Sequence, residues 1–135
     1  MEKQKKVIDA SVIVKWFSEE KDSDKAIKIK EDFLEGRLIL IAPYLIFPEI
    51  LNALRYKQKN EKQLVRANKM LWNMSLKLES INQDVMSKAI ENSLRFNITI
   101  YDAIYVTLAQ INGTFLITSD SELYKIPNVI ALEKI

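Results

Sequence analysis

The stretch Lys6-Val-Ile-Asp9-Ala-Ser-Val-Ile-Val-Lys-Trp-Phe17 decides the fold. Its first four residues form a short apolar run ending in an acid, which predicts a buried strand. The remainder is apolar without a turn residue, so its pattern allows strand or helix, and we assign a helix beginning near Ala10. Asp9 then lies at a strand-to-helix junction, with Ser11 in the first helical turn. Asp9 is therefore either the N-cap of this helix or a functional acid at the end of a strand.

Short apolar runs alternate with helical patterns along the rest of the chain. Further strands are predicted at 38–41, 77–81, 114–117 and 128–132, and helices at 23–35, from Pro43 to Asn60, 61–74, 83–96 and from Thr99 to Gly113. Pro48 predicts a kink or a late start in its helix, because it has no N–H to donate to Tyr44. This alternation implies parallel pairing with right-handed crossovers. We predict one α/β domain over residues 1–135, with a mainly parallel sheet of four or five short strands.

Helical spacing also predicts which side chains face the core. The predicted inner faces are Ala26, Ile29, Lys30 and Phe33; Leu64, Ala67, Leu71 and Met74; Met86, Ala89, Ile90 and Ser93; and Ile104, Leu108 and Ile111. Lys30 is the imperfect match among them. Val65 and Trp72 belong to neither face of their helix, so we expect them to be available to another subunit.

Composition limits the possible chemistry. The chain has 135 residues, 48% hydrophobic and 28% charged, which is typical of one globular domain with a core. It contains no cysteine and no histidine. Disulfides, thiolate metal sites, Ser-His-Asp and Cys-His catalysis and the usual zinc ligand are therefore excluded. A bound metal must be held by oxygen, which points to Mg²⁺ or Mn²⁺.

Charge and hydropathy indicate a cytoplasmic protein. The basic start is followed by no signal-peptide core, and the longest apolar run, Leu38 to Pro48, is too short to span a bilayer and contains two prolines. We therefore expect a soluble, cytoplasmic chain with no membrane contact. The net charge of +2 is too small to indicate nucleic-acid binding by itself.

Four carboxylates lie where apolar stretches meet polar ones: Asp9, Glu49, Asp102 and Asp120. Ligands of parallel α/β sheets bind beyond the carboxyl ends of the strands. Asp9 and Asp120 both follow such ends, so we expect them to meet. Clustered, desolvated carboxylates repel one another and have raised pKa values, and a divalent cation relieves that repulsion.

Each acid also has a structural alternative. Asp9 suits an N-cap, and Glu49 suits a salt bridge or a solvated rim. Thr99-x-x-Asp102 resembles a capping box, which the helix dipole also favours. Asp120 suits the cap of the turn that precedes Leu123.

Three neighbouring polar residues are open to the same two kinds of interpretation. Ser119-x-x-Glu122 is a capping box that competes with Asp120, and it makes Glu122 structural rather than ligating. Ser11 and Thr118 either support the acids through their hydroxyls or bond the local backbone.

Basic residues crowd into the predicted hairpin of 43–74. They are Arg55, Lys57, Lys59, Lys62, Arg66 and Lys69. They form either a solvated face or a strip that follows phosphate groups beside the acidic site, for which Arg55, Lys59, Lys62 and Arg66 are the candidates. Such a strip predicts binding that weakens with salt.

Four segments of the chain resemble, in order, the motifs of PIN-domain proteins, and especially of VapC-type toxins. These are Val7–Phe17 with Asp9, Pro48–Leu54 with Glu49, Tyr101–Ala109 with Asp102, and Leu116–Leu123 with Asp120. The resemblance implies a single PIN-like domain with an α/β/α sandwich and a ribonuclease site in which these acids bind Mg²⁺ or Mn²⁺. It also implies a homodimer and a VapB-type antitoxin in the active-site groove. Pro48, directly before Glu49, is the one departure, and it bears on the orientation of that acid.

Three functions follow from these observations, in decreasing order of support. The first is a metal-dependent endoribonuclease that hydrolyses phosphodiesters of single-stranded or looped RNA with a metal-activated water. The second is a catalytically weak PIN-like adaptor that binds RNA or protein. The third is a phosphoryl-transfer domain with Asp9 as nucleophile, although Ser11 stands where a phosphatase of that type has a second acid.

Overall fold

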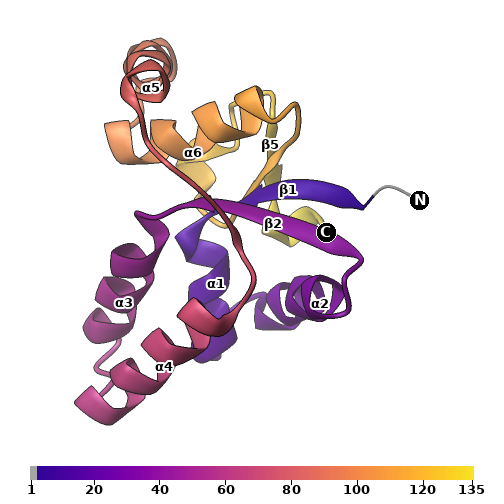
Figure 1. The fold of residues 1–135 in the computed structure, drawn as a ribbon, viewed down its shortest axis with the longest axis vertical. Helices are drawn as coiled ribbons and strands as arrows, with labels where there is room; N and C mark the ends of the chain where they lie inside the picture. Colours follow the sequence, from indigo (N-terminus) through magenta and orange to yellow (C-terminus); the bar gives the residue numbers. More distant parts are fainter. Residues whose placement is uncertain (1–2) are drawn as a thin grey trace.

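A computed structural model describes residues 3–135 of the chain. Figure 1 shows the elements in chain order. They are β1 (Gln4–Ile8), α1 (Ala10–Phe17), α2 (Ser23–Leu34), β2 (Leu38–Pro43), α3 (Ile46–Tyr56), α4 (Glu61–Asn73), β3 (Lys77–Glu79), α5 (Gln83–Phe96), α6 (Ile100–Ile111), β4 (Leu116–Thr118) and β5 (Val129–Ala131), with 3₁₀ turns at Ser121–Leu123 and Leu132–Lys134. The strand-to-helix assignment of residues 6–17 is confirmed.

The strands form one sheet in the order β3-β2-β1-β4-β5, with every pair parallel. Helices α1–α4 lie on one side of the strands and α5 and α6 on the other (Figure 1), which confirms the predicted α/β/α sandwich. β1 is central, and its Ile8 pairs with Ile117 of β4. The residues that follow these two strands therefore leave the sheet side by side.

The core is densest around β1 and α6. Val7 and Ile8 are fully buried. In α6 every residue from Ala103 to Ala109 is buried, so this helix is enclosed on most of its surface rather than along one stripe. Its position next to β1 and β2 brings its first turn to the carboxyl edge of the sheet.

Helix α3 starts late, as predicted from Pro48. Pro43 was assigned to the first helical turn, which is wrong, because it is the last residue of β2 and pairs with Glu79. The helix begins at Ile46, so Pro48 lies in its first turn. An N–H at this position has no intrahelical partner in any helix, so the proline costs no hydrogen bond.

Two predicted core positions are wrong. Ile90 and Ile111 are exposed, at 48% and 46%. The contact between α5 and α6 is partly polar, because the amide of Asn92 donates to Thr107 Oγ1 and Gln110 Oε1, both at 2.9 Å. Apolar spacing cannot identify such a contact, so the inner side of α5 was assigned one step out of register.

Two smaller differences have simple causes. Lys30 is half-buried because its ammonium group lies 5.9 Å from the centroid of the Trp16 ring. Strand β4 begins at Leu116 rather than Thr114, and Phe115 is exposed at 44%.

None of the helices between residues 3 and 135 is long and apolar enough to cross a lipid bilayer.

Candidate active site

Asp9 lies directly after β1 and is only 8% exposed. Its backbone N–H continues the parallel ladder by donating to the carbonyl of Ile117 at 3.1 Å. Its carboxylate oxygen Oδ2 accepts two side-chain hydrogen bonds, from Ser11 Oγ at 2.9 Å and from Thr118 Oγ1 at 2.7 Å. Asp9 occupies the N-cap position of α1, as one of its two interpretations predicted, but its side chain makes no capping hydrogen bond to the helix.

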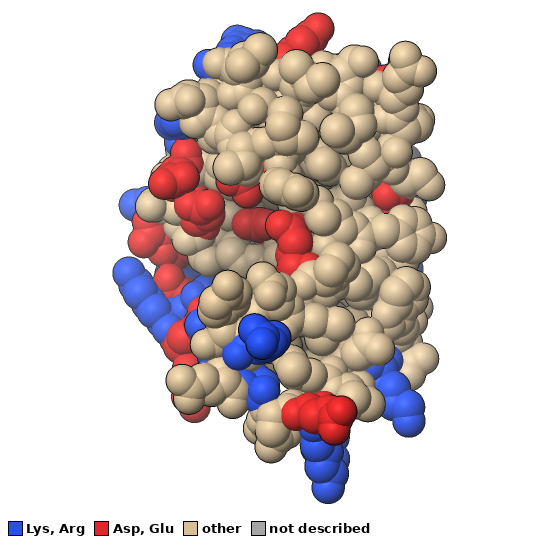
Figure 2. Space-filling model, turned by 90° about the vertical axis from the view of Figure 1, so that its left-hand side faces the viewer, with Lys and Arg blue, Asp and Glu red and all other residues tan. Residues whose placement is uncertain are grey.

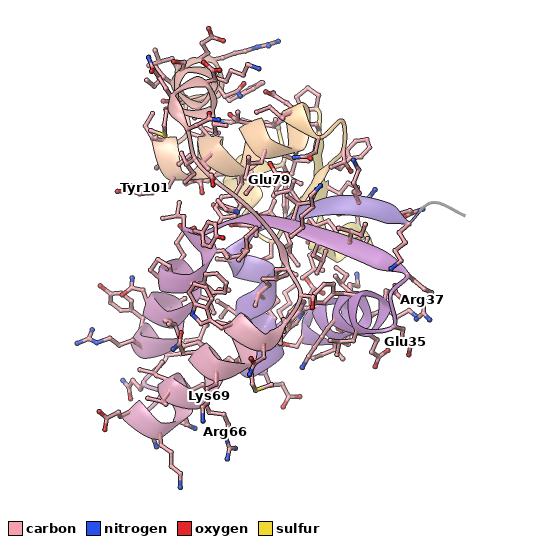
Figure 3. All side chains as sticks on the ribbon, in the orientation of Figure 1. Glu35, Arg37, Arg66, Lys69, Glu79 and Tyr101 are labelled. Atoms are coloured by element: carbon pink, nitrogen blue, oxygen red, sulfur yellow. The ribbon has the colours of Figure 1, made fainter. Side chains whose placement is uncertain are left out.

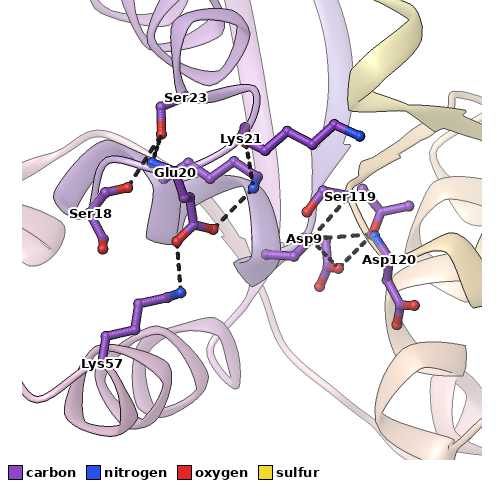
Figure 4. A network of polar contacts seen from close by, with 11 residues as sticks. Asp9, Ser18, Glu20, Lys21, Ser23, Lys57, Ser119 and Asp120 are labelled. Atoms are coloured by element: carbon purple, nitrogen blue, oxygen red, sulfur yellow. Dashed lines mark hydrogen bonds and ion pairs between the residues drawn. The ribbon is translucent and has the colours of Figure 1, made fainter.

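Ser11 and Thr118 tie the loop after β4 to Asp9. The backbone N–H of Ser119 donates to Ser11 Oγ, and that of Asp120 donates to Thr118 Oγ1, both at 3.1 Å. Figure 4 shows this network beside Asp9 and Asp120. The hydroxyls therefore contact the acid itself and also the local backbone, so the two interpretations of Ser11 and Thr118 are compatible.

Glu49 lies in the first turn of α3, partly buried. Its Oε1 accepts a hydrogen bond of 2.5 Å from the hydroxyl of Tyr105 on α6. Among residues 3–135 no lysine or arginine forms an ion pair with it, so the salt-bridge interpretation is not observed. Sequence analysis missed Tyr105. The available signal was a tyrosine within a largely apolar helical segment, where a buried hydroxyl needs a partner.

Asp102 lies in the first turn of α6 and is partly buried. Its backbone N–H donates to Thr99 Oγ1 at 3.1 Å, so half of the predicted capping box is present. That bond uses the backbone of Asp102, and its carboxylate stays available. Burial raises the pKa of Asp102 to about 6, and the charges of Asp9 and Asp120 add to the increase.

Asp120 caps the 3₁₀ turn that follows it, as one of its two interpretations predicted. Its Oδ1 accepts from the backbone N–H of Glu122 at 3.0 Å. Asp120, not Ser119, is the N-cap, so the competing capping box is wrong. The carboxylate still belongs to the acidic group, because its charge contributes to raising the pKa values of Asp9 and Asp102.

The four acids thus form one electrostatic group at the carboxyl edge of the sheet. Burial raises the pKa of Asp9 and of Glu49, and the charges of Asp9 and Asp102 raise that of Glu49 further. Figure 2 shows acidic side chains gathered around a hollow in this face, with basic side chains below it. Uncompensated carboxylates at a recessed edge are typical of a site that binds a cation.

The donor set fits a hard divalent cation. Only oxygen donors are present, and Mg²⁺ is commonly bound through one or two carboxylates while it keeps several waters. Within residues 3–135, no three acidic side chains are already arranged as ligands of a single ion. The mutual repulsion of the carboxylates is the observation that favours Mg²⁺ or Mn²⁺ here.

A groove of about 770 Å³ runs between α3 and α4 and includes Glu49. Arg55 lines it, together with apolar side chains such as Leu51 and Val65. Lys59 and Arg66 line a different, smaller cavity of about 150 Å³. In Figure 3, Arg66 and Lys69 project from α4 at the lower edge, whereas Tyr101 projects from the start of α6.

The predicted basic residues line different hollows of the surface. Lys57 is bound in an ion pair with Glu20 at 2.7 Å, and Lys62 is exposed on α4. Of the four candidates for RNA contact, Arg55 alone shares a groove with one of the acids.

Comparison with known families identifies the class of protein. The family model described as PIN domain matches residues 6–129, and the chain belongs to this family. A curated relative, Ribonuclease VapC3 from Pyrobaculum aerophilum, is 29% identical over 121 residues, which are 88% of this chain and 92% of the relative.

Solved structures show the same fold at lower identity. VapC20 from Mycobacterium tuberculosis, described as a sarcin-ricin loop cleaving toxin, has a TM-score of 0.74 at 14% identity, over 92% of this chain and 96% of its own. A toxin-antitoxin complex from Klebsiella pneumoniae contains a chain with a TM-score of 0.71 at 17% identity, over 93% of this chain and 96% of its own. A chain of VapBC2 from Rickettsia felis, bound to a promoter DNA fragment, has a TM-score of 0.68 at 13% identity, over 95% of this chain and 97% of its own.

Proposed function

We propose that this chain is a metal-dependent endoribonuclease, the toxin of a VapBC-type toxin–antitoxin pair, acting in the cytoplasm. One observation carries the proposal: Asp9, Glu49, Asp102 and Asp120 form one electrostatic group at the sheet edge, without a cationic partner among residues 3–135. The ribonuclease name of the relative VapC3 supports the same activity.

The acids have different roles in this proposal. Asp9 and Asp102 would hold the metal directly, and Glu49 and Asp120 would complete the site directly or through water. Ser11 and Thr118 fix Asp9 through Oδ2, so Oδ1 receives neither hydroxyl bond and remains available. Asp120 uses Oδ1 as a cap, which leaves its Oδ2. When bound there, Mg²⁺ or Mn²⁺ would polarise the scissile phosphate and lower the pKa of an attacking water.

The substrate in this proposal is single-stranded or looped RNA, because an unpaired backbone reaches a recessed site more easily than a duplex. The description of VapC20 as cleaving a loop supports this choice. Arg55 is the first phosphate contact, since it lines the groove that contains Glu49. Lys59, Lys62 and Arg66 contribute weaker, longer-range attraction.

The partners are a VapB-type antitoxin and a second copy of the chain. The groove between α3 and α4 exposes apolar surface next to an acid, and Val65 within it is 56% exposed. Trp72 is 55% exposed and is held in place by stacking on Phe47, with ring centroids 4.1 Å apart. Light scattering of the purified chain tests for the dimer, and co-purification with the protein encoded by the adjacent gene tests for the antitoxin.

Cleavage of structured RNA with and without Mg²⁺ tests the activity. We expect Mg²⁺-dependent cleavage that is lost in Asp9→Asn and in Asp102→Asn. Metal-independent cleavage, or full activity in both variants, would overturn the proposal. Calorimetry with Mn²⁺ distinguishes the adaptor alternative, for which no binding is expected at millimolar metal.

A further inference from the structure

We propose that Tyr105 is a positioning residue of the metal site: its hydroxyl holds Oε1 of Glu49 so that Oε2 is presented to the cation. This inference rests on the proposed function. Tyr105 touches neither metal nor RNA in this scheme, and it acts only through Glu49.

The geometry makes Tyr105 the donor and Glu49 the acceptor. The distance between Tyr105 Oη and Glu49 Oε1 is 2.5 Å, and the two residues are 56 positions apart in sequence. Tyr105 is only 1% exposed, so water cannot replace its partner. A phenol hydroxyl carries one proton to donate, whereas an ionised carboxylate can only accept, so the bond runs from Tyr105 to Glu49.

Glu49 needs such a contact because little else fixes it. It follows Pro48 in the first turn of α3 and lines an open groove. No ion pair within residues 3–135 involves it. A glutamate side chain has several rotatable bonds, and ordering it for a ligand costs conformational entropy. The Tyr105 hydroxyl orders the carboxylate before the metal arrives.

The same arrangement occurs at Asp9. There Ser11 and Thr118 occupy one oxygen, Oδ2, with neutral hydroxyls. A neutral donor orients a carboxylate without cancelling its charge, whereas a lysine would compete with the cation. In both acids, hydroxyl groups bind one carboxylate oxygen and leave the other. Glu49 is held by Tyr105, and Asp9 is held by Ser11 and Thr118.

Helix α6 links two of the acids through this contact. Asp102 and Tyr105 are three residues apart, so they lie on the same face of the helix. Asp102 supplies one carboxylate of the site, and Tyr105 positions the carboxylate of Glu49 on α3 relative to that of Asp102.

The test is Mn²⁺ affinity of Tyr105→Phe, measured by calorimetry. Phenylalanine keeps the ring in its buried position and removes only the hydroxyl. We expect Mn²⁺ binding to weaken about tenfold, the lower end of the effect of losing a contact to a metal ligand. Tyr56→Phe is the matched control, because Tyr56 lies on α3 but is 76% exposed, and its affinity should stay unchanged. Metal-free melting curves confirm that each variant is folded.

A double-mutant cycle with Glu49→Gln separates positioning from packing. If Tyr105 acts through the Glu49 carboxylate, Tyr105→Phe weakens Mn²⁺ binding in the wild-type background and has no further effect in Glu49→Gln. An equal loss in both backgrounds overturns the inference, because it indicates a general structural role. Unchanged affinity of Tyr105→Phe overturns it as well.

Cleavage assays add a second readout. Tyr105→Phe should raise the Mn²⁺ concentration for half-maximal cleavage about tenfold, while kcat at saturating metal recovers. A kcat that stays low at every metal concentration contradicts the inference. If the wild-type chain binds no Mn²⁺, the proposed function fails instead, and the two failures are thereby distinguished.

Discussion

Helix α1 has an acid just before its first residue and another just beyond its end, and the two are in opposite environments (Figure 4). Asp9 has hydroxyl partners and like-charged neighbours, and burial raises its pKa. Glu20 lies between Lys15 at 3.0 Å and Lys57 at 2.7 Å. Burial would raise the pKa of Glu20 too, but the hydrogen bonds from Lys57 and Lys15 outweigh it and lower that pKa. A compensated carboxylate fastens elements together, whereas an uncompensated one is suited to binding a cation.

The largest expected difference between the two regions is in activity. Asp102→Asn removes a charge from the uncompensated group, and we expect Mg²⁺-dependent RNA cleavage to fall at least about 100-fold. Glu20→Gln, assayed beside it, should keep cleavage within about twofold, because Glu20 lies outside the acidic group. Comparable losses of cleavage in Asp102→Asn and Glu20→Gln would show that the uncompensated acid is no more important for activity than the compensated one.

For folding stability we expect the reverse, with the larger loss in Glu20→Gln rather than in Asp102→Asn. Glu20→Gln leaves Lys15 without its countercharge, and the side chain of Lys15 is only 9% exposed. Removing one partner of a largely buried pair is costly, and since Glu20 is partly exposed we expect a loss of about 2 kcal/mol in the free energy of unfolding. Urea denaturation at pH 7 measures it. A loss below the error of the method would mean that the ion pairs contribute little.

The acidic group should make metal-free stability depend on pH in a defined direction. In the folded chain the pKa of Asp102 is raised from 3.8 to about 6, so folded Asp102 binds its proton more tightly than unfolded Asp102. Its contribution is therefore favourable below about pH 4 and is lost as the pH rises through about 6. In EDTA at pH 7, Asp102→Asn should be more stable than wild type by about 1 kcal/mol, a value reduced because solvent screens a partly exposed group.

Denaturation at several pH values, with wild type and variant side by side, checks this expectation. The advantage of Asp102→Asn should vanish near pH 4 and reverse in saturating Mg²⁺, because only wild type then gains the full binding energy. An advantage that is constant with pH would show that the charge of Asp102 is not its cause.

The comparison also shows what sequence could predict. The alternation of apolar runs and helical patterns was sufficient for a parallel sheet, and that topology placed Asp9 and Asp120 at one edge. Contacts made by polar groups inside the core were not predictable from spacing. Asn92, which bonds Thr107, faces the core from α5 while Ile90 is exposed, and the bond from Tyr105 to Glu49 joins residues 56 positions apart on two helices.

The basic residues illustrate a second limit. Their crowding in sequence allowed either a solvated face or one strip, and it did not show which of them lie in the same hollow. Arg55 lines the groove with Glu49, and Lys59 lines another cavity with Arg66. Only the crossing of α3 and α4 decides which side chains share a surface, and sequence periodicity does not contain that angle.

Arg55 and Lys57, two residues apart at the end of α3, extend the comparison from acids to bases and give the smallest expected effect. Lys57 is held by Glu20, while Arg55 lines the groove next to an acid. If Arg55 contacts a phosphate, Arg55→Gln should weaken RNA binding a few-fold and reduce the slope of log K against log salt by about 0.7, the value for one contact to a single strand. Lys57→Gln should leave that slope unchanged, because its charge is already neutralised. Salt titrations of RNA binding with the inactive Asp102→Asn chain measure both, and an unchanged slope for Arg55→Gln would show that Arg55 makes no phosphate contact.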